Sequence, residues 1–309
     1  MNFKRPMLQT NFLKIKFPNP LVLASGILGV TAASMARAVR NGCGGVTVKS
    51  LSKEPRAGHP NPTMSGKKDY FINAVGLSNP GVAKGVEELK KFKTMTNAPL
   101  IGSIFAGTTD EFSEVAEKIC EAPIDLLEVN ISCPNVGEEF GSPFAYSPEA
   151  VAVITKKVKA KSTVPVLIKL APGVWNISEI AKAAESAGAD ALTAGNTIGG
   201  MEIVVRARKA LLHNKVGGVS GPALFPIALK SVYEIYQAVK IPIIGTGGVT
   251  TGEDALAMVM AGATLVGVGS AVYYRGEKAF KKISEEMESI MKEEGIKNLG
   301  EVRGCVVGD

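Results

Sequence analysis

Short apolar runs recur along the chain, with helical patterns between them. The runs are mostly continuous rather than alternating, which is typical of buried parallel strands. Eight runs stand out, at Leu21–Ala24, Gly45–Val48, Leu100–Phe105, Leu126–Val129, Val164–Ile168, Ala191–Ala194, Ile241–Ile244 and Thr264–Val268. The helical patterns include Asp110–Cys120, Ser147–Lys161, Ser178–Ala187, Leu224–Val239 and Gly252–Ala261.

Strand–helix alternation repeated about eight times predicts an α/β fold, a (β/α)₈ TIM barrel, with residues 1–309 as one domain. A doubly wound open sheet would rarely sustain so many consecutive units. Residues 1–20 are expected to form a short N-terminal extension, a hairpin covering the bottom of the barrel. Segments 50–80, 131–147 and 195–222 are long connections that follow strands. They should therefore lie at the C-terminal face, where barrel enzymes keep their active sites.

Composition narrows the class of protein. The chain is 46% hydrophobic and 21% charged, with four scattered cysteines and no C-x-x-C pair. This favours a globular protein of a reducing, cytoplasmic compartment. No signal peptide and no apolar run of about 18 residues is recognised, so no membrane span is expected. The net charge of +6 is interpreted as solubility rather than nucleic-acid binding, since no dense Lys/Arg block occurs. His59 and His213 lack a carboxylate pattern, so we predict no metal site and expect both to be exposed.

Polar residues or glycines follow most of the apolar runs. In a barrel these positions converge on one concave pocket. Strands often simply end in polar residues, which explains Ser25 and Ser103. It does not explain Lys49 and Lys169, because a lysine flush against a buried strand is costly without an anionic partner.

Two glycine clusters, Gly245–Gly248 and Gly267–Ser270, follow the seventh and eighth predicted strands. Barrel enzymes commonly bind a phosphate there on backbone N–H groups, and glycine leaves room for its approach. The run Gly217–Gly221 is expected to add further backbone amides.

The segment Asn130–Asn135 reads N-I-S-C-P-N and lies just past a strand end. A free cysteine is usually a small buried hydrophobe. Cys133 instead lies in a loop between amide side chains, and a thiol with an ordinary pKa of about 8.5 can exchange a proton near neutrality. No histidine adjoins it to make a protease-like nucleophile. Cys43, Cys120 and Cys305 are interpreted as structural.

Taken together, these motifs resemble the class 1 dihydroorotate dehydrogenases, which are FMN enzymes of pyrimidine (UMP) synthesis. A cysteine rather than a serine at position 133 separates class 1 from the membrane-associated class. The resemblance covers nearly the whole chain and rests on Asn19–Gly26, Val48–Ser50, Asn73–Pro80, Asn130–Asn135, Ile168–Pro172, Gly195–Ile198, Gly217–Pro222 and Gly245–Val249.

This resemblance implies roles for individual residues. Cys133 would take a proton from C5 of dihydroorotate while hydride passes from C6 to flavin N5. Lys49 would lie between the flavin and the substrate carboxylate, and so would count as catalytic as well. Substrate contacts are implied for Lys49, Asn73, Gly76, Leu77, Asn130, Asn135, Asn196 and Thr197.

The resemblance also implies a flavin site. Lys169 would face the flavin ring, where a fixed cation favours the reduced state. Ser103 stands where relatives often carry an asparagine, so one flavin contact is expected to be lost or replaced. Loop 131–147 would close as a lid. FMN contacts are implied for Ala24, Ser25, Gly26, Lys49, Ser50, Ser103, Asn130, Lys169, Gly221, Gly247, Gly248, Gly269 and Ser270.

Within class 1, Glu54–Gly58 and the run from Asn196 to Gly221 resemble the NAD-linked subtype. That subtype pairs its FMN subunit, a homodimer, with a second subunit carrying FAD and an iron–sulfur cluster. This chain has no cysteine pattern for a cluster and no convincing G-x-G-x-x-G fingerprint. The resemblance therefore implies that a partner subunit supplies NAD.

Other functions stay open at this point. Dihydropyrimidine dehydrogenase shares the Cys–Pro loop, although Asn135 favours a substrate with a carboxylate. A tRNA dihydrouridine synthase would suit the basic pI, but that family usually has glycine before its Cys–Pro and adds a helical domain. A non-redox phosphate-binding barrel, such as a lyase or isomerase, explains the glycines but not Cys133 with two lysines. A scaffold role explains none of the strand-end residues.

Overall fold

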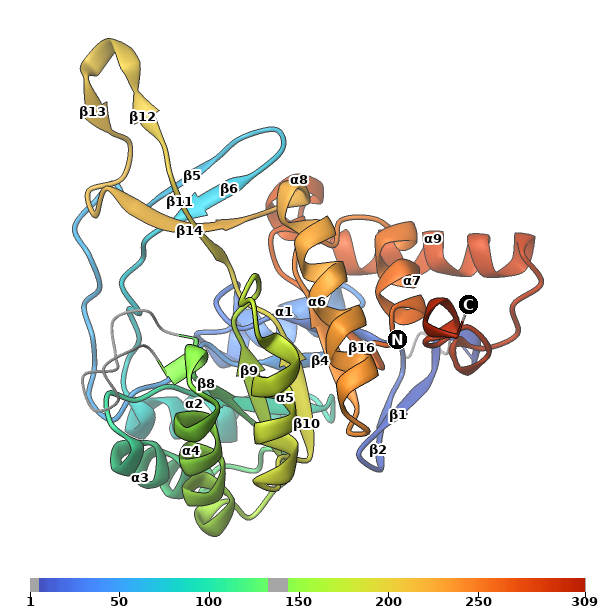
Figure 1. Ribbon diagram of the computed structural model, residues 1–309, viewed down its shortest axis with the longest axis horizontal. Coiled ribbons are helices and arrows are strands. Elements are labelled where there is room, and N and C mark those ends of the chain that lie inside the picture. Colours follow the sequence, from blue (N-terminus) through green and yellow to red (C-terminus); the bar gives the residue numbers. More distant parts are fainter. Residues whose placement is uncertain (1–5, 133–143, 309) are drawn as a thin grey trace.

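Eight parallel strands close into a barrel, as the sequence pattern predicts. The computed structural model describes residues 6–132 and 144–308. The strands lie in the spatial order β10-β15-β16-β3-β4-β7-β8-β9, and Figure 1 shows β8, β9 and β10 side by side. Each strand begins and ends within two residues of its predicted bounds. The bounds are β3 Leu21–Leu23, β4 Gly45–Thr47, β7 Leu100–Ile104, β8 Leu126–Asn130, β9 Val166–Leu170, β10 Ala191–Ala194, β15 Ile243–Thr246 and β16 Leu265–Val268.

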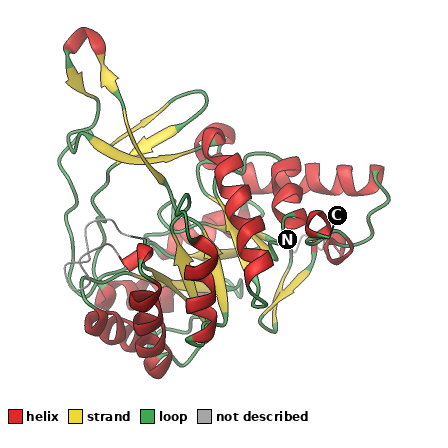
Figure 2. Cartoon of the chain, viewed as in Figure 1, coloured by secondary structure: helices red, strands yellow, loops and turns green. Residues whose placement is uncertain are grey.

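Helices surround this barrel (Figure 2), and those given bounds from the sequence lie within one residue of them. Side-chain caps explain where several begin. The hydroxyls of Thr31, Thr108, Ser147 and Thr251 each accept a backbone N–H in the first turn, which satisfies a donor the helix leaves unpaired. The helices are α1 Ala32–Arg40, α2 Val82–Met95, α3 Thr109–Ile119, α4 Pro148–Lys161, α5 Ile177–Ser186, α6 Phe225–Ala238, α7 Gly252–Met260, α8 Ala271–Arg275 and α9 Ala279–Glu293.

An N-terminal hairpin closes the bottom of the barrel, which confirms that prediction. Strands β1 (Thr10–Phe12) and β2 (Ile15–Phe17) pair antiparallel. Their rings, Phe12 and Phe17, form one buried cluster with residues from the first half of the barrel strands. A Cβ on Gly45 would lie 2.5 Å from the Phe17 ring, so glycine at this position leaves room for the hairpin to pack against the barrel. The other residues of this cluster are Val22, Ile101, Leu126, Leu167, Ala191, Ile244 and Leu265.

The barrel interior changes from apolar to polar along the strands. Because side chains alternate between faces, residues two apart on a strand point the same way. Two residues beyond Ile101, Leu126, Leu167 and Ala191 the inward face therefore carries polar side chains. These are Ser103, Glu128, Lys169 and Thr193, all 5% exposed or less. The apolar layer seals the bottom, and the polar layer lies toward the C-terminal ends of the strands.

The long connections 50–80 and 195–222 pair with each other above the barrel. They form a four-stranded antiparallel sheet in the order β11-β14-β6-β5. The sequence pattern predicts only loops here, because glycines weaken the strand signal of β11 and β14. The bounds are β5 Met64–Gly66, β6 Phe71–Asn73, β11 Ile198–Met201 and β14 Val216–Ser220.

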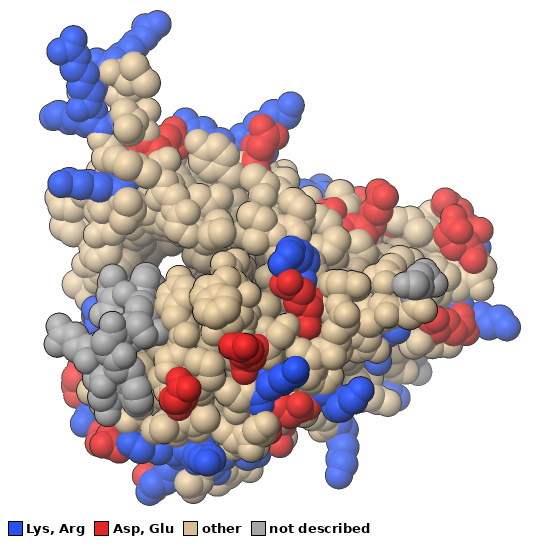
Figure 3. Space-filling view, viewed as in Figure 1, with Lys and Arg blue, Asp and Glu red and all other residues tan. Residues whose placement is uncertain are grey.

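A second small hairpin projects from this sheet, away from the barrel (Figure 1). It consists of β12 (Ile203–Val204) and β13 (Lys209–Ala210) around the 3₁₀ turn Val205–Ala207. Figure 3 shows basic side chains gathered on it, and Arg206, Arg208 and Lys209 are all exposed. The remaining 3₁₀ turns are Pro6–Leu8, Phe144–Tyr146, Pro222–Leu224, Leu299–Glu301 and Cys305–Val307. Among the described helices, none has the length and apolar character needed to cross a membrane.

Candidate active site

A cavity of about 610 Å³ lies at the C-terminal ends of the barrel strands, under the four-stranded sheet. Its walls come from strand ends and from both long connections, as the barrel pattern predicts. Pockets of a few hundred to 1,000 Å³ are typical of cofactor and small-molecule sites. Predicted site residues that line it are Ala24, Ser25, Gly26, Lys49, Ser50, Asn73, Gly76, Leu77, Asn130, Lys169, Asn196, Thr197, Gly247, Gly248, Gly269 and Ser270.

Four predicted residues do not line the described cavity. Ser103 is fully buried behind Ser50, and their hydroxyl oxygens lie 2.9 Å apart. Gly221 lies against Tyr70 and Tyr274, where a Cβ would come within 2.8 Å of the Tyr274 hydroxyl. Cys133 and Asn135 lie outside the described residues, as does most of the predicted lid. The roles implied for all four stay predictions.

Interlocking amide and hydroxyl side chains form one wall. Asn130 Oδ1 accepts from the backbone N–H of Ser132 at 3.3 Å and from its hydroxyl at 2.6 Å. Asn196 Nδ2 donates to Asn130 Oδ1 at 3.4 Å and also to the hydroxyl of Ser132. Asn196 Oδ1 accepts the backbone N–H of Thr197 at 2.8 Å. These bonds fix the amide orientations before any ligand arrives, which suits recognition of a polar planar molecule.

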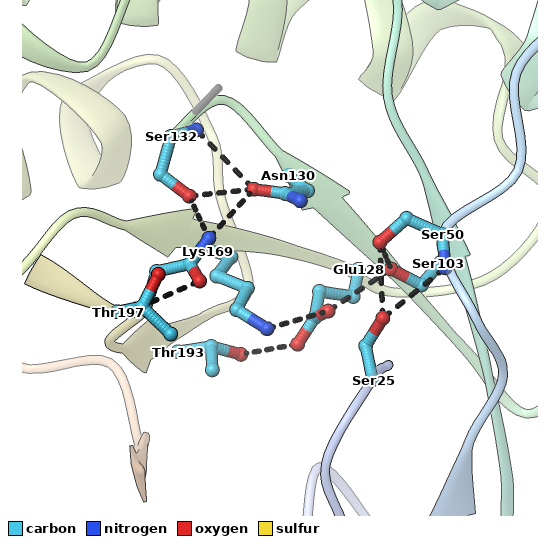
Figure 4. A network of polar contacts seen from close by, with 10 residues as sticks. Ser25, Ser50, Ser103, Glu128, Asn130, Ser132, Lys169, Thr193 and Thr197 are labelled. Carbon is cyan, nitrogen blue, oxygen red and sulfur yellow. Dashed lines mark hydrogen bonds and ion pairs between the residues drawn. The ribbon is translucent and has the colours of Figure 1, made fainter. Parts of the chain in front are cut away.

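A buried carboxylate lies beneath the cavity, within the polar layer of the barrel (Figure 4). Glu128 is 2% exposed and accepts hydrogen bonds from Ser103 Oγ and Thr193 Oγ1, each at 3.0 Å. Its Oε1 lies 3.6 Å from Lys169 Nζ. Glu128 is therefore the anionic partner that Lys169 requires in its buried position on β9. Sequence reasoning missed it, although a glutamate inside the apolar run of β8 was a visible signal.

The Glu128 carboxylate decides which hydroxyl donates and which accepts along a row of hydrogen-bonded serines. Ser103 donates its one hydroxyl hydrogen to Glu128, so it must accept from Ser50. Ser50 in turn must accept from Ser25, at 3.0 Å. Both Ser25 and Ser50 line the cavity. Their hydrogens are used within this row, so these hydroxyls present oxygen lone pairs to a ligand.

Gly248 after β15 and Gly269 after β16 are both predicted to bind phosphate, but each is a glycine for a different structural reason. Gly248 has φ +74°, and a Cβ there would lie 2.5 Å from the backbone nitrogen of Phe225 at the start of α6. Packing against α6 therefore excludes a side chain. At Gly269 the nearest atom to a Cβ would be 3.6 Å away, in Ala24. The fold itself would tolerate a side chain at Gly269, so its absence serves to leave the cavity open.

His59 corrects an expectation. It is half-buried, not exposed, and lines the cavity. Its Nδ1 lies 3.2 Å from the carbonyl oxygen of Ala74, because the chain at Gly76 packs directly against it. His213 is exposed, as expected. Other lining residues that sequence reasoning did not single out include Tyr146, Asn214 and Tyr273.

The three described cysteines lie away from the cavity lining. Cys43 is buried, accepts the backbone N–H of Leu23 and donates to the carbonyl of Gly45. Burial raises the pKa of this thiol to about 12, so it stays protonated and is part of the packing. Cys120 is half-buried at the end of α3, and Cys305 is exposed.

Comparison with known proteins identifies the family. The sequence model described as "Dihydroorotate dehydrogenase" matches residues 7–291. The chain is 44% identical to a protein of Methanocaldococcus jannaschii over 301 residues, covering 96% of this chain and 97% of that protein. It is also 44% identical to one of Pyrococcus abyssi, covering 97% and 99%. Both are named dihydroorotate dehydrogenase B (NAD(+)), catalytic subunit.

A solved structure agrees with the fold. The dihydroorotate dehydrogenase of Eimeria tenella, in complex with ferulenol, superimposes with a TM-score of 0.84 at 22% identity. The match covers 99% of this chain and 90% of that one. At this identity the likeness concerns the fold alone, and the sequence matches carry the assignment: the chain belongs to the dihydroorotate dehydrogenase family.

Proposed function

We propose that this protein is the FMN-dependent catalytic subunit that oxidises (S)-dihydroorotate to orotate in pyrimidine biosynthesis. The observation that carries the proposal is the convergence of two lysines, Lys49 and Lys169, with the Asn130–Asn196 amide wall on one cavity. Cations and amides suit a ligand that combines a carboxylate with a pyrimidine ring. The names of relatives more than 40% identical support the same substrate.

The cavity fits FMN on its own residues. Its volume of about 610 Å³ accommodates a cofactor together with a small substrate. Gly26 and Gly269 leave the walls open, since a Cβ at either would meet no atom within 3.5 Å. Lys169 provides a nearly buried cation, and Gly247 and Gly248 would hold the phosphate on backbone N–H groups. When bound, FMN supplies the hydride acceptor.

The chain's own residues would then bind the substrate and move one proton. Asn73, Asn130 and Asn196 would hold the pyrimidine, and Lys49 would pair with its carboxylate. Cys133 would take the proton from C5 as the hydride leaves C6, which yields orotate. Asn135 and the backbone of Gly76–Leu77 would complete the contacts. The roles of Cys133 and Asn135 rest on the sequence motif.

Electrons must leave this subunit through another protein. The relatives are named as catalytic subunits that use NAD(+), whereas this chain shows no convincing dinucleotide fingerprint. We infer a partner subunit that carries FAD and an iron–sulfur cluster, a homodimer of this subunit, one barrel domain over residues 1–309, and a cytoplasmic location. The isolated chain should fail to reduce NAD, and reconstitution with the partner should restore it.

An anaerobic absorbance spectrum tests the function directly. The purified protein is reconstituted with FMN, and dihydroorotate is added without oxygen. We expect a yellow protein that bleaches, a Cys133→Ala variant that stays yellow, and a Cys305→Ala control that bleaches normally. A protein that cannot be loaded with FMN would revive the non-redox barrel. A yellow protein that ignores dihydroorotate but bleaches with dihydrouracil would act on an uncharged pyrimidine instead.

A further inference from the structure

Glu128 and Lys169 form an ion pair beneath the cavity, and the proposed reaction gives Glu128 no role. Lys169 lines the cavity, but its charge is not the only one that a bound molecule meets. Glu128 Oε1 lies 3.6 Å from Lys169 Nζ. Their side chains are 3% and 6% exposed, so water screens neither charge effectively.

Glu128 is held in place independently of Lys169. Ser103 on β7 and Thr193 on β10 donate to its two oxygens, each at 3.0 Å. Ser103 is also the cross-strand partner of Glu128, and Thr193 is that of Lys169. The carboxylate is therefore fixed by barrel register and by two hydroxyl donors that do not depend on the lysine.

We propose that Glu128 offsets the charge of Lys169 and would thereby lower the reduction potential of FMN held in the cavity that Lys169 lines. This inference rests on the proposed function, since it requires FMN in the cavity. A lone buried cation would favour the reduced, more negative flavin. A fixed anion beside that cation removes much of this preference. Glu128 is thus a positioning residue that acts through the electrostatics of the pair, without touching substrate.

A lower potential suits the electron acceptor. A flavin that must pass electrons onward to NAD needs to remain a good reductant, and an uncompensated lysine would make it a poorer one. An ion pair lets the cavity keep a lysine for hydrogen bonding without the full electrostatic effect of its charge. Glu128 thus adjusts the reduction potential of the flavin toward a value that suits electron transfer to NAD.

The test removes each charge of the pair singly and then both together. The midpoint potential of FMN bound to the full-length protein is measured for each variant. Glu128→Gln keeps the side-chain volume and removes the anion, so the potential should rise. The rise should correspond to at least a tenfold gain in affinity for reduced over oxidised FMN, about 30 mV for a two-electron couple. Lys169→Met should lower the potential. The double variant, with neither charge, should return close to the wild type.

Controls separate this effect from general disruption. Glu117→Gln removes an exposed carboxylate that pairs with Lys161, and it should leave the potential unchanged. Thr193→Val keeps the Glu128 carboxylate but removes the hydroxyl that donates to its Oε2. Less of the negative charge is then offset by hydrogen bonds, so the carboxylate opposes Lys169 more strongly. Its potential should fall, opposite to Glu128→Gln, so the sign is testable even if Glu128→Gln does not fold.

Three outcomes overturn the inference. An unchanged or lowered potential in folded, FMN-loaded Glu128→Gln would show that Glu128 does not offset the lysine. A double variant that stays as high as Glu128→Gln would show that the glutamate does not act against Lys169. A wild-type protein that binds no FMN would instead overturn the proposed function, and this inference with it.

Discussion

Asn130 lies opposite Lys169 in the parallel pairing of β8 with β9, and both side chains line the cavity. Two residues earlier on β8, Glu128 reaches the same lysine from below. One strand thus supplies the ligand-facing amide and the buried counter-charge. Barrel register, rather than any local motif, places an amide, a cation and an anion within one small region.

Asn130→Ala should weaken orotate binding to the FMN-loaded protein. The amide accepts from Ser132 and Asn196, so its loss frees two wall residues as well as one contact. A hydrogen bond contributes about 0.5–1.5 kcal/mol net, and the variant loses both the ligand contact and the fixed orientation of the wall, so we expect a dissociation constant tenfold to hundredfold higher. Titration of the flavin absorbance measures it. Asn41→Ala, which removes a side chain capping the end of α1, is the matched control. Equal affinities in both variants would contradict the role.

Gly248→Ala should destabilise the protein and impair FMN retention. Its Cβ would lie 2.5 Å from the Phe225 backbone nitrogen, in a left-handed conformation at φ +74°. Overpacking costs about 1–3 kcal/mol and the backbone strain about 1–2 kcal/mol. Gly295, in the turn that ends α9, has φ +70° with no atom within 4 Å of a Cβ, so Gly295→Ala should show the strain alone. Thermal unfolding with and without FMN compares them, and similar losses would disprove the packing argument.

The Cys43 thiol should make stability fall at alkaline pH. Its pKa is raised to about 12 in the folded protein from 9.0, so above about pH 9 the unfolded chain loses this proton while the folded chain keeps it. Stability that is fully present below pH 9 should decline by roughly 1.4 kcal/mol per pH unit as pH rises. Denaturant unfolding at pH 8 and pH 10 measures this decline. A Cys43→Ala variant should lack this component, and identical slopes would refute it.

Glu286 should make stability depend on acid pH in the opposite sense. The Arg275 guanidinium holds the pKa of this carboxyl below its usual range. Glu286 also accepts the backbone N–H of Gly252 at 2.8 Å, which ties α9 to the start of α7. The stabilisation is present above the unfolded pKa and is lost as pH falls through the folded one.

We therefore expect Glu286→Gln to cost about 1 kcal/mol at pH 7, a figure discounted for exposure, and progressively less as pH falls below the ordinary carboxyl pKa of 4.5. Glu121→Gln breaks an exposed pair with Lys118 and should cost no more than about 0.5 kcal/mol at any pH. A series of unfolding curves from pH 7 down through the acid range measures both costs. A Glu286→Gln cost that does not change across the series would assign the effect to packing rather than to charge.

The sequence alone determined the barrel, five of its helices, the bottom hairpin and sixteen of the residues that line the cavity. These features follow from local patterns: continuous apolar runs, helical periodicity and polar residues at strand ends. Lys49, Asn130 and Lys169 could be placed at one face because parallel strands all end on the same side of a barrel.

Only the tertiary structure decided how these residues meet. It paired segments 50–80 and 195–222 into a sheet, buried Ser103 behind Ser50 and brought His59 into the cavity wall. It also supplied Glu128 as the partner of Lys169. Each of these facts depends on contacts between residues far apart in the chain, which are set by strand register and barrel closure. Periodicity along one strand carries no information about which side chain faces it from the next.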